Sequence, residues 1–299
     1  MPIKYIFNGF FKSGTTLIWY IIKNSNKDYI VFYEPFRPKR YETLNAYKSK
    51  KINKKDLTNK IHKRVLLDEY FFFGESFLEE IKKQPTRYHL NDLNERNLLV
   101  YLHYFHKLEK KVILQTNRLF LYNQVISNEF EVPFFNIVRN PLDVYSSIKK
   151  HRKSAKRNLL ISFLFSLSNS RKRLFNKNIF YFRLNELIDL FNKEKDFLSF
   201  DQIKKKKWNQ FERFLYIWIV ANYSLINDNI IMFSYEMLLK KPQKIKSLIE
   251  SKTNLNFNYD GIIEEKSITE YNHYKIITSV KKVGLLNQYQ EIIESLNKI

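Results

Sequence analysis

Residues 7–16 read FNGFFKSGTT, and this stretch sets the fold of the chain. It joins a short apolar run at residues 5–7, which favours a buried strand, to residues 15–23, which favour a helix that begins on hydroxyl residues. A loop between a strand and a helix directs backbone N–H groups and the positive end of the helix dipole to one point. The stretch therefore predicts a site for an anion.

The composition of the loop strengthens this prediction. Gly14 lets the backbone approach a ligand closely, Lys12 brings a compact positive charge, and the hydroxyl groups of Ser13, Thr15 and Thr16 add donors. The alternative is an ordinary strand-to-helix turn in a lysine-rich chain. Lys12 precedes the second glycine of the stretch, whereas the phosphate loop of nucleotide hydrolases, G-x-x-x-x-G-K-[ST], has its lysine after that glycine. The dinucleotide pattern G-x-G-x-x-G is also absent from the stretch.

The same alternation of apolar strands and longer helical segments continues along the chain. Further strands are predicted at residues 29–33, 111–115, 132–138 and 230–235. Helices are predicted at residues 94–107, 142–151, 156–175, 211–225, 242–251 and 288–298. Strands that alternate with helices favour an α/β fold with a mostly parallel central sheet and helices on both faces. We expect a single domain over residues 1–299, with a helical excursion from the sheet at about residues 150–229.

The 299 residues carry a large excess of positive charge, because 52 Lys and Arg against 30 Asp and Glu give a net charge of +22. Such an excess indicates polyanionic partners, namely nucleic acid, phosphate-bearing cofactors, acidic glycans or an anionic membrane. AT-rich codon usage is the alternative source of the lysines, since Asn, Ile, Phe and Tyr are abundant too. Cysteine is absent, which excludes disulfides, thiolate nucleophiles and zinc sites with Cys ligands.

The sequence shows neither a secretion signal nor a membrane span. The first residues lack a basic segment followed by an apolar one, and no apolar stretch approaches the roughly 20 residues that a transmembrane helix needs. We therefore expect a soluble, cytoplasmic protein.

A second cluster of polar residues lies about 125 residues after the loop, again where a predicted strand ends. Residues 139–147 read RNPLDVYSS, and Pro141 suits the first turn of the helix that follows. Arg139 at the strand end can grip a phosphate with two parallel N–H donors, and Ser147, two turns into the helix, can add a hydroxyl. A third stretch, FSYEML at residues 233–238, also joins a strand to a helix.

In these three stretches the chain resembles the sulfotransferases that use 3′-phosphoadenylyl sulfate (PAPS). Residues 11–17, FKSGTTL, match the 5′-phosphosulfate loop P-K-S-G-T-T-[WL] of that family, except that Phe11 replaces its proline. Residues 139–147 match the 3′-phosphate motif R-[DN]-P-x-D-x-x-x-S at every defined position, and residues 235–242 match Y-E-x-L-x-x-x-P. Trp218 and Asn222 match the W-x-x-x-N stretch of the helix before it. The resemblance covers about residues 3–36, 111–151 and 214–250.

The resemblance implies a P-loop-like fold and transfer of a sulfuryl group from PAPS to a hydroxyl or amine, with adenosine 3′,5′-bisphosphate as product and no metal. The loop around the 5′-phosphosulfate would consist of Lys12, Ser13, Gly14, Thr15 and Thr16. Lys12 would stabilise the leaving phosphate, because positioning and charge stabilisation dominate such transfers by analogy with phosphoryl transfer. Arg139 and Ser147 would hold the 3′-phosphate, and Tyr235 would contact the nucleotide.

Transfer to a hydroxyl also needs a general base. In the cytosolic small-molecule branch of the family this base is a histidine in a Lys-Thr-His stretch, but residues 115–117 here are Gln-Thr-Asn. The carbohydrate and protein-tyrosine branches use a glutamate soon after the first helix, and Glu34 occupies that place. The chain is therefore closer to the carbohydrate and bacterial branches. The alternative for Glu34 is a turn carboxylate paired with Arg37 or Arg40, and Arg118 would orient Glu34 or bind the acceptor.

The resemblance makes a glycan or glycolipid the expected acceptor, and nucleic acid is not an expected partner. Basic residues at 149–157 and 171–173 flank an apolar segment, which is typical of peripheral membrane contact or of a buried helix whose ends reach solvent. His103 and His106 stand at helical spacing, but no carboxylate pattern completes a metal site, so we interpret them as ordinary helix residues.

Two other functions stay open at this point. One is a P-loop kinase or ATPase that uses Mg-ATP, and the other is a non-catalytic basic protein that binds polyanions. The position of Lys12 before Gly14 and the motif at residues 139–147 argue against the kinase. The chain contains no recognisable nucleic-acid module, which argues against one form of the basic binder.

Overall fold

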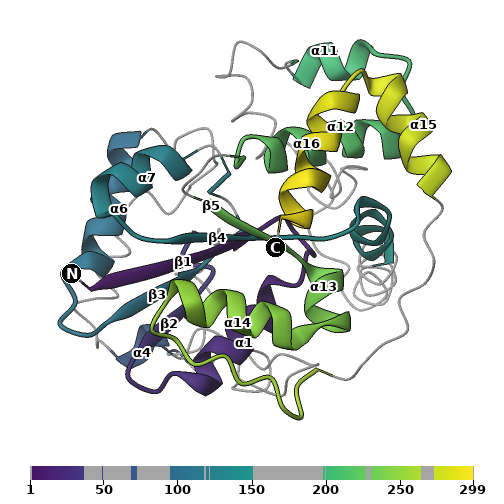
Figure 1. Ribbon diagram of the computed structural model, residues 1–299. Helices are drawn as coiled ribbons and strands as arrows, with labels where there is room; N and C mark the ends of the chain where they lie inside the picture. Colours follow the sequence, from purple (N-terminus) through teal and green to yellow (C-terminus); the bar gives the residue numbers. More distant parts are fainter. Residues whose placement is uncertain are drawn as a thin grey trace.

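The fold is that of a computed structural model, which describes residues 2–36, 49, 69–72, 95–117, 119–120, 122–150, 198, 200–226, 230–263 and 273–298. Five strands form one sheet: β1 (Ile3–Gly9), β2 (Ile30–Tyr33), β3 (Val112–Gln115), β4 (Phe134–Val138) and β5 (Ile230–Ser234). Their order across the sheet is β2-β3-β1-β4-β5, and every neighbouring pair is parallel (Figure 1). The expected α/β fold with a parallel central sheet is confirmed.

The strand order places a change of direction at β1 and β4. From β1 the chain passes over β3 to form β2, returns to β3, and then crosses β1 to reach β4 on the other side. Loops that leave β1 and β4 therefore diverge, and such a point in an open parallel sheet leaves a crevice beyond the carboxyl ends of the strands. Both of the anion motifs expected from the sequence begin at this crevice, one after β1 and one after β4.

The strands are apolar along their length because both faces of the sheet are covered. Phe7 of β1 pairs in register with Phe135 of β4 and with Gln115 of β3. The rings of Phe7 and Phe135 stack with centroids 4.7 Å apart. Neighbouring aromatic side chains thus fix the alignment of the two strands that carry the anion motifs.

Helices cover the sheet on two sides (Figure 1). Below the sheet in that view lie α1 (Thr15–Ser25), α13 (Tyr235–Lys240) and α14 (Pro242–Lys252), and above it lie α12 (Gln210–Tyr223), α15 (His273–Val283) and α16 (Leu286–Asn297). The other described helices are α4 (Glu69–Phe72), α6 (Glu95–His106), α7 (Asn123–Phe130), α11 (Phe200–Lys205) and a helical stretch at residues 141–150. None of the helices in the described ranges is both long and apolar enough to cross a membrane.

Helix α12 lies in the upper layer, and its sequence explains where it begins. The side chain of Asn209 accepts hydrogen bonds from the backbone N–H groups of Phe211 and Glu212, and Glu212 Oε2 accepts one from the Asn209 N–H at 2.7 Å. This capping box satisfies donors that the first turn of a helix leaves open. Lys282 of α15 holds the other oxygen of Glu212 at 2.8 Å, so α15 is tied to the start of α12.

The predicted strands and most predicted helices agree with the structure to within a few residues at each end. The helices α4, α7 and α15 were not expected. The residue before α7 is Tyr122, whose side chain does not cap the helix, so the start of α7 has no local signal. Helix α15 is followed by Gly284, which has a φ angle of 77° and is a signal from which the end of the helix could have been predicted. Helices α11 and α12 lie within residues 150–229, where a helical excursion is expected. The expected helix at residues 156–175 lies outside the described residues, as do most of the basic residues at 149–157 and 171–173.

Candidate active site

The two anion motifs meet at the carboxyl ends of β1 and β4. The Nη1 atom of Arg139, which follows β4, donates a hydrogen bond to the backbone oxygen of Lys12 at 3.1 Å. Adjacent strands lie about 4.8 Å apart, so loops that leave neighbouring strands can make such a contact directly. Residues that are 127 positions apart in the chain thus form one site.

The loop after β1 has an unusual backbone conformation. Lys12 and Gly14 both have positive φ angles, of 68° and 99° respectively. The backbone N–H and the hydroxyl of Ser13 both donate to the Phe10 carbonyl, and Ser13 is fully buried. The Ser13 side chain therefore shapes the loop from inside. A left-handed conformation at a lysine costs energy and is concentrated at functional sites, which supports a role for this loop in binding.

Gly14 is needed because an aromatic ring occupies the space beside it. A Cβ atom at Gly14 would overlap with the ring of Tyr235, from the third motif. Gly14 also stands at the N-terminus of α1, and its carbonyl accepts the N–H of Leu17 at 2.9 Å. The Tyr235 ring therefore lies against the N-terminus of α1, where the sequence predicts an anion site.

Arg139 contacts three groups, and one of its N–H donors has no partner among the described residues. Its guanidinium lies 4.6 Å from the centre of the Tyr235 ring, and Nη2 lies 3.8 Å from Asp143 Oδ2. The Nε atom is buried and has no hydrogen-bond partner in the described part of the chain. Burial raises the pKa of Tyr235, although the charge of Arg139 opposes that shift, so this phenol stays neutral near physiological pH. A buried donor of this kind requires an acceptor, and an anion is one group that could supply it.

Glu236 fixes the turn that presents Arg139, a role that the sequence did not reveal. Its Oε1 accepts the backbone N–H of Asn140 at 3.0 Å, and the Asn140 side chain in turn accepts the N–H of Leu142 at 2.9 Å. Burial raises the pKa of the Glu236 carboxyl, and the hydrogen bond from Asn140 opposes this shift. The third motif thus supports the second through its glutamate as well as through its tyrosine.

Ser147 lies on the same face of its helix as the ion-paired Asp143. It is half-buried and follows Asp143 by four residues, which is about one helical turn. Since Asp143 faces Arg139, this face of residues 141–150 is directed toward the site. The expected grouping of Ser147 with Arg139 is consistent with this placement.

The start of α1 is linked to the end of β2. The Thr16 hydroxyl lies 3.0 Å from the hydroxyl of Tyr33, and the indole N–H of Trp19 donates to the Val31 carbonyl at 3.0 Å. Thr15, by contrast, is buried beside Gly9, where a Cβ atom on the glycine would lie 2.7 Å from its methyl group. Of the three hydroxyl residues in the loop, Thr16 is the one directed toward β2.

Glu34 follows β2 and is held by the end of β3. Its backbone N–H donates to the Gln115 carbonyl at 2.8 Å, and its φ angle is positive, at 44°. The buried side chain of Asn117 donates from Nδ2 to Glu34 Oε1 at 2.9 Å. Asn117 therefore orients the expected base. In the sequence, Asn117 is notable only because it stands where the small-molecule branch has its histidine.

The basic residues expected near Glu34 lie outside the described residues; these are Arg37, Arg40 and Arg118. The end of β2 is separated from the end of β1 by one strand, β3. Two strand spacings amount to about 10 Å. This separation leaves room for a reacting group between the loop of Lys12 and the carboxylate of Glu34.

A row of buried amides crosses from the sheet to α12 beneath the site. Asn8 Nδ2 donates to Asn136 Oδ1 at 3.1 Å, and Asn136 Nδ2 donates to Asn222 Oδ1 at 3.4 Å. Asn222 Nδ2 completes the row with a bond to the Trp218 carbonyl at 2.8 Å. These side chains are almost fully buried, so Trp218 and Asn222 belong to the core that supports the site.

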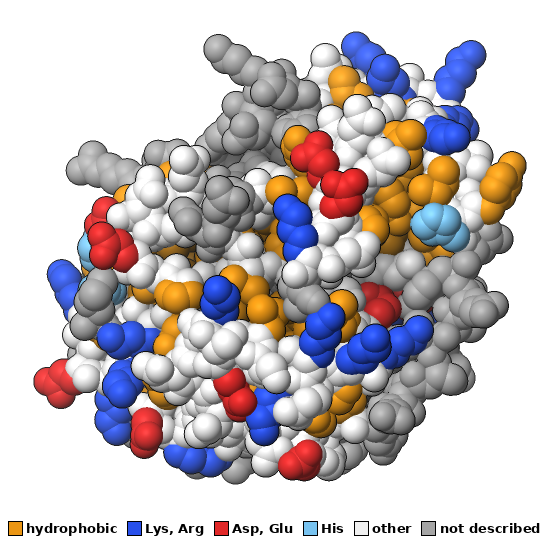
Figure 2. Space-filling model, viewed as in Figure 1, with side chains coloured by type: hydrophobic (Ala, Val, Ile, Leu, Met, Phe, Trp, Pro, Cys, Tyr) orange, Lys and Arg blue, Asp and Glu red, His pale blue; other side chains and the backbone are white. Residues whose placement is uncertain are grey.

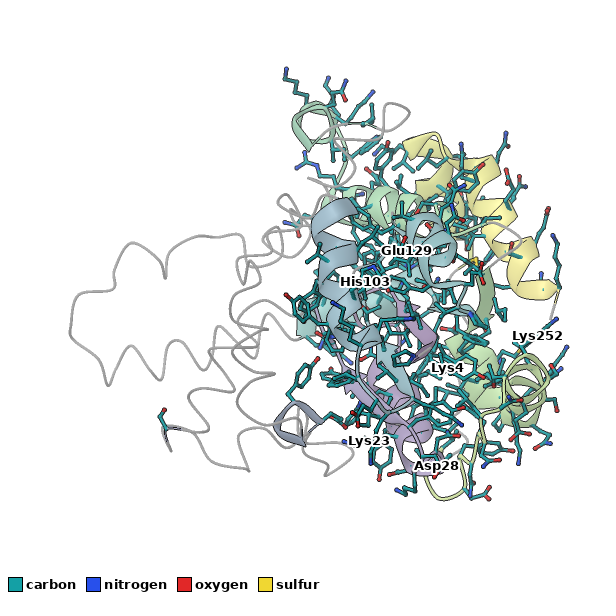
Figure 3. All side chains as sticks on the ribbon, turned by 90° about the vertical axis from the view of Figure 1, so that its left-hand side faces the viewer. Lys4, Lys23, Asp28, His103, Glu129 and Lys252 are labelled. Carbon is teal, nitrogen blue, oxygen red and sulfur yellow. The ribbon has the colours of Figure 1, made fainter. Side chains whose placement is uncertain are left out.

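The histidines of α6 lie far from these loops. Figure 3 looks at the edge of the sheet where the strands begin, and it shows His103 beside Glu129 of α7. The Nε2 atom of His103 lies 2.9 Å from Glu129 Oε1, and the ring of His106 packs against Phe130. Within the described residues no three His, Asp or Glu side chains come together as metal ligands would.

Comparisons with known proteins add little to the geometry. No protein-family model matches the chain. A protein of Archaeoglobus fulgidus, described as "Uncharacterized protein", is 28% identical over 159 residues, which are 48% of this chain and 46% of that protein. The chain thus matches about half the length of this curated relative.

Among solved structures, the fold is similar to the "Sulfotransferase Domain from the Curacin Biosynthetic Pathway". The identity is 13%, the alignment covers 99% of this chain and 98% of that chain, and the TM-score is 0.43. A likeness this weak carries no argument about function. The functional assignment therefore depends on the residues that the fold brings together.

Proposed function

We propose that the chain is a sulfotransferase that transfers a sulfuryl group from PAPS to a hydroxyl group. The observation that carries the proposal is the contact of the Arg139 guanidinium with the Lys12 backbone, under the ring of Tyr235. Three motifs from distant parts of the chain converge there on one helix N-terminus, with two cationic side chains and a buried donor that has no partner among the described residues. Such a site suits a ligand with phosphate groups at both ends of a nucleoside.

The residues present fit PAPS in its charge and its two phosphate positions. The N–H groups of Thr15 and Thr16, at the start of α1, would hold the 5′-phosphosulfate with Lys12. Arg139 would hold the 3′-phosphate with its Nε donor, which has no partner in the described part of the chain, and Ser147, one helical turn after Asp143, would add its hydroxyl. Tyr235 would form a wall of the nucleotide site.

The donor supplies a sulfuryl group on a good leaving phosphate, and the chain supplies position, charge and a base. The acceptor oxygen attacks sulfur, the bond from sulfur to the bridging oxygen breaks, and adenosine 3′,5′-bisphosphate leaves. Lys12 neutralises the negative charge that grows on the bridging oxygen. The acceptor proton passes to the carboxylate of Glu34, which Asn117 orients, and general base catalysis of this kind contributes roughly 10²–10⁴-fold.

A carbohydrate hydroxyl, on a glycan or a glycolipid, is the acceptor that we propose. A carboxylate base at the end of β2 fits an alcohol that has to lose its proton during transfer. No step in this scheme requires a metal ion from the protein.

The experiment that tests the proposal is thermal unfolding with adenosine 3′,5′-bisphosphate, compared with 5′-ADP and with Mg-ATP. A ligand at about 100 times its Kd adds roughly 2.7 kcal/mol to the free energy of unfolding. We expect the unfolding temperature to rise by several degrees with the bisphosphate and by clearly less with 5′-ADP. Stabilisation by Mg-ATP alone would establish the kinase alternative, and no stabilisation by any nucleotide would contradict a donor site.

A further inference from the structure

We infer that the acceptor is an acidic polysaccharide, which binds to a basic surface over the first turn of α12. The basic surface consists of exposed lysines near the start of α12. Lys275 and Lys282 contact residues of α12, Lys149 contacts Tyr145 beside it, and Lys206 and Lys207 precede α12 in the chain. This inference rests on the proposed function and extends it, because it names the charge of the acceptor. It is carried by the contacts of this surface with the site and by the balance of charge around it.

The first two turns of α12 pack against both anion motifs. Phe214 lies 6.0 Å from Phe10 of the loop after β1, measured between ring centres. Tyr145, on the helix that carries Ser147, lies 5.2 Å from Phe211 and 5.3 Å from Phe214. A ligand on the basic surface would therefore lie next to the proposed donor site, where an acceptor has to be.

Cations and aromatic rings alternate across this surface. Lys149 Nζ lies 4.9 Å from the centre of the Tyr145 ring, and Lys275 Nζ lies 5.7 Å from the centre of the Phe211 ring. Since the two rings are neighbours, Lys149 and Lys275 flank one aromatic pair. Such contacts hold lysine side chains in place while their ammonium groups stay near solvent.

The charge around α12 is strongly unbalanced. Among the residues whose side chains the structure describes, positions 200–213 and 273–284 hold seven basic residues and one acidic residue. The basic residues are Lys205, Lys206, Lys207, Arg213, Lys275, Lys281 and Lys282, and the acidic residue is Glu212. Glu212 is buried and paired with Lys282, so these two charges offset each other and six basic residues remain. In Figure 2, Lys and Arg side chains lie over α11 and the upper part of α15, whereas acidic side chains gather over α16.

The same surface fits a membrane or a nucleic acid less well. Docking on a bilayer requires several exposed apolar side chains, but the described residues expose only three large ones, and of these only Tyr274 belongs to α15. Binding of single-stranded nucleic acid requires open ring faces on which bases stack. The Tyr145 and Phe211 rings are buried, with exposures of 9% and 6%, so they offer no such platform.

The test compares two double variants with the same loss of charge. The first, Lys149→Gln with Lys275→Gln, changes the basic surface. The second, Lys244→Gln with Lys252→Gln, removes two exposed lysines from α14, on the other side of the sheet. Binding to a heparin oligosaccharide is measured over a series of salt concentrations. Neutral dextran, anionic phosphatidylglycerol vesicles and an RNA oligonucleotide serve as the other probes.

We expect the first double variant to bind heparin about tenfold more weakly, with a salt dependence smaller by about two released counterions. The α14 variant should keep nearly the wild-type affinity and salt dependence. Equal losses in the two variants would overturn the inference, because they would show only the effect of net charge. Absence of heparin binding, or preferential binding to vesicles or RNA, would overturn it as well.

Binding of adenosine 3′,5′-bisphosphate to each variant separates this inference from the proposed function. If the wild-type chain binds the bisphosphate and both double variants do too, a failed heparin test refutes only the acidic acceptor. If the wild-type chain does not bind the bisphosphate, the proposed function itself fails. With O-desulfated heparin as the acceptor and labelled PAPS as the donor, the first variant should raise the acceptor KM while kcat and the donor KM stay unchanged.

Discussion

Replacing Gly14 with alanine puts a methyl group where the ring of Tyr235 lies. The change acts in two ways. Gly14 has a φ angle of 99°, and an L-residue in the left-handed region costs roughly 1–2 kcal/mol. The overlap with the ring forces a shift of packed groups, which typically costs about 1–3 kcal/mol. We therefore expect Gly14→Ala to lower the free energy of unfolding by roughly 2–5 kcal/mol.

Gly284 provides the matched control. Its φ angle is also positive, at 77°, but a Cβ atom there would meet nothing within 4 Å. Gly284→Ala should therefore lower the free energy of unfolding only by the cost of the backbone conformation, roughly 1–2 kcal/mol. Urea unfolding of both variants, followed by fluorescence or circular dichroism, measures the difference between them.

The overlap with Tyr235 can be isolated in a double variant. Gly14→Ala combined with Tyr235→Ala removes the ring, so the two changes should cost less together than the sum of each alone. Displacement of the Tyr235 ring also removes its stacking contact with the Arg139 guanidinium. Gly14→Ala should therefore weaken the binding of adenosine 3′,5′-bisphosphate. Equal destabilisation by Gly14→Ala and Gly284→Ala, with additive costs in the double variant, would refute this reasoning.

Four further predictions concern single groups of the site. Lys12→Ala should abolish transfer and weaken bisphosphate binding, as measured by labelled sulfate transfer and calorimetry. Arg139→Ala should weaken ligands with a 3′-phosphate at least about tenfold more than 5′-ADP, because a charge-assisted hydrogen bond contributes roughly 1.5–3 kcal/mol; equal weakening of both would contradict its role. Glu34→Gln and Asn117→Ala should both keep bisphosphate binding, with transfer lost in the first and reduced in the second; wild-type turnover by Glu34→Gln would exclude it as the base. Burial raises the pKa of Glu236, so folding favours its protonated form and the wild-type chain should lose stability as the pH rises from the ordinary carboxyl range through the raised value. Glu236→Gln cannot titrate, and a stability difference between it and the wild type that does not change with pH in urea unfolding would contradict this prediction.

The sequence alone predicts those elements whose signals lie within a few neighbouring residues. The loop at residues 10–14 and the turn at residues 139–141 each combine a strand end, a helix start and polar residues within a few positions. The two motifs meet because β1 and β4 are neighbours in the sheet. The sequence predicted parallel strands but not their order, which the structure shows.

The supporting contacts could not be predicted because they join residues with no common pattern. The hydrogen bond from Asn117 to Glu34 depends on the alignment of β3 with β2. This alignment cannot be predicted from the sequences of two short apolar strands. The bond from the Asn140 N–H to Glu236 joins a backbone group to a side chain 96 residues later. Within a motif such as Y-E-x-L-x-x-x-P, Glu236 resembled an ordinary residue in the first turn of a helix.

The buried amides of Asn8, Asn136 and Asn222 also bear on how the chain selects one strand register. All three donate in the same sense, and the Asn8 oxygen accepts the Leu119 N–H at 3.4 Å, so both the nitrogen and the oxygen of every amide in the row are hydrogen-bonded. A slip of one residue between β1 and β4 would turn one amide toward the opposite face and leave its neighbours unpaired. Each unpaired group costs about 1–3 kcal/mol, so the misaligned sheet is disfavoured more strongly than an apolar sheet would be. The buried amides thus disfavour incorrect strand registers during folding. The register that pairs them is also the one in which Arg139 bonds to the backbone of Lys12.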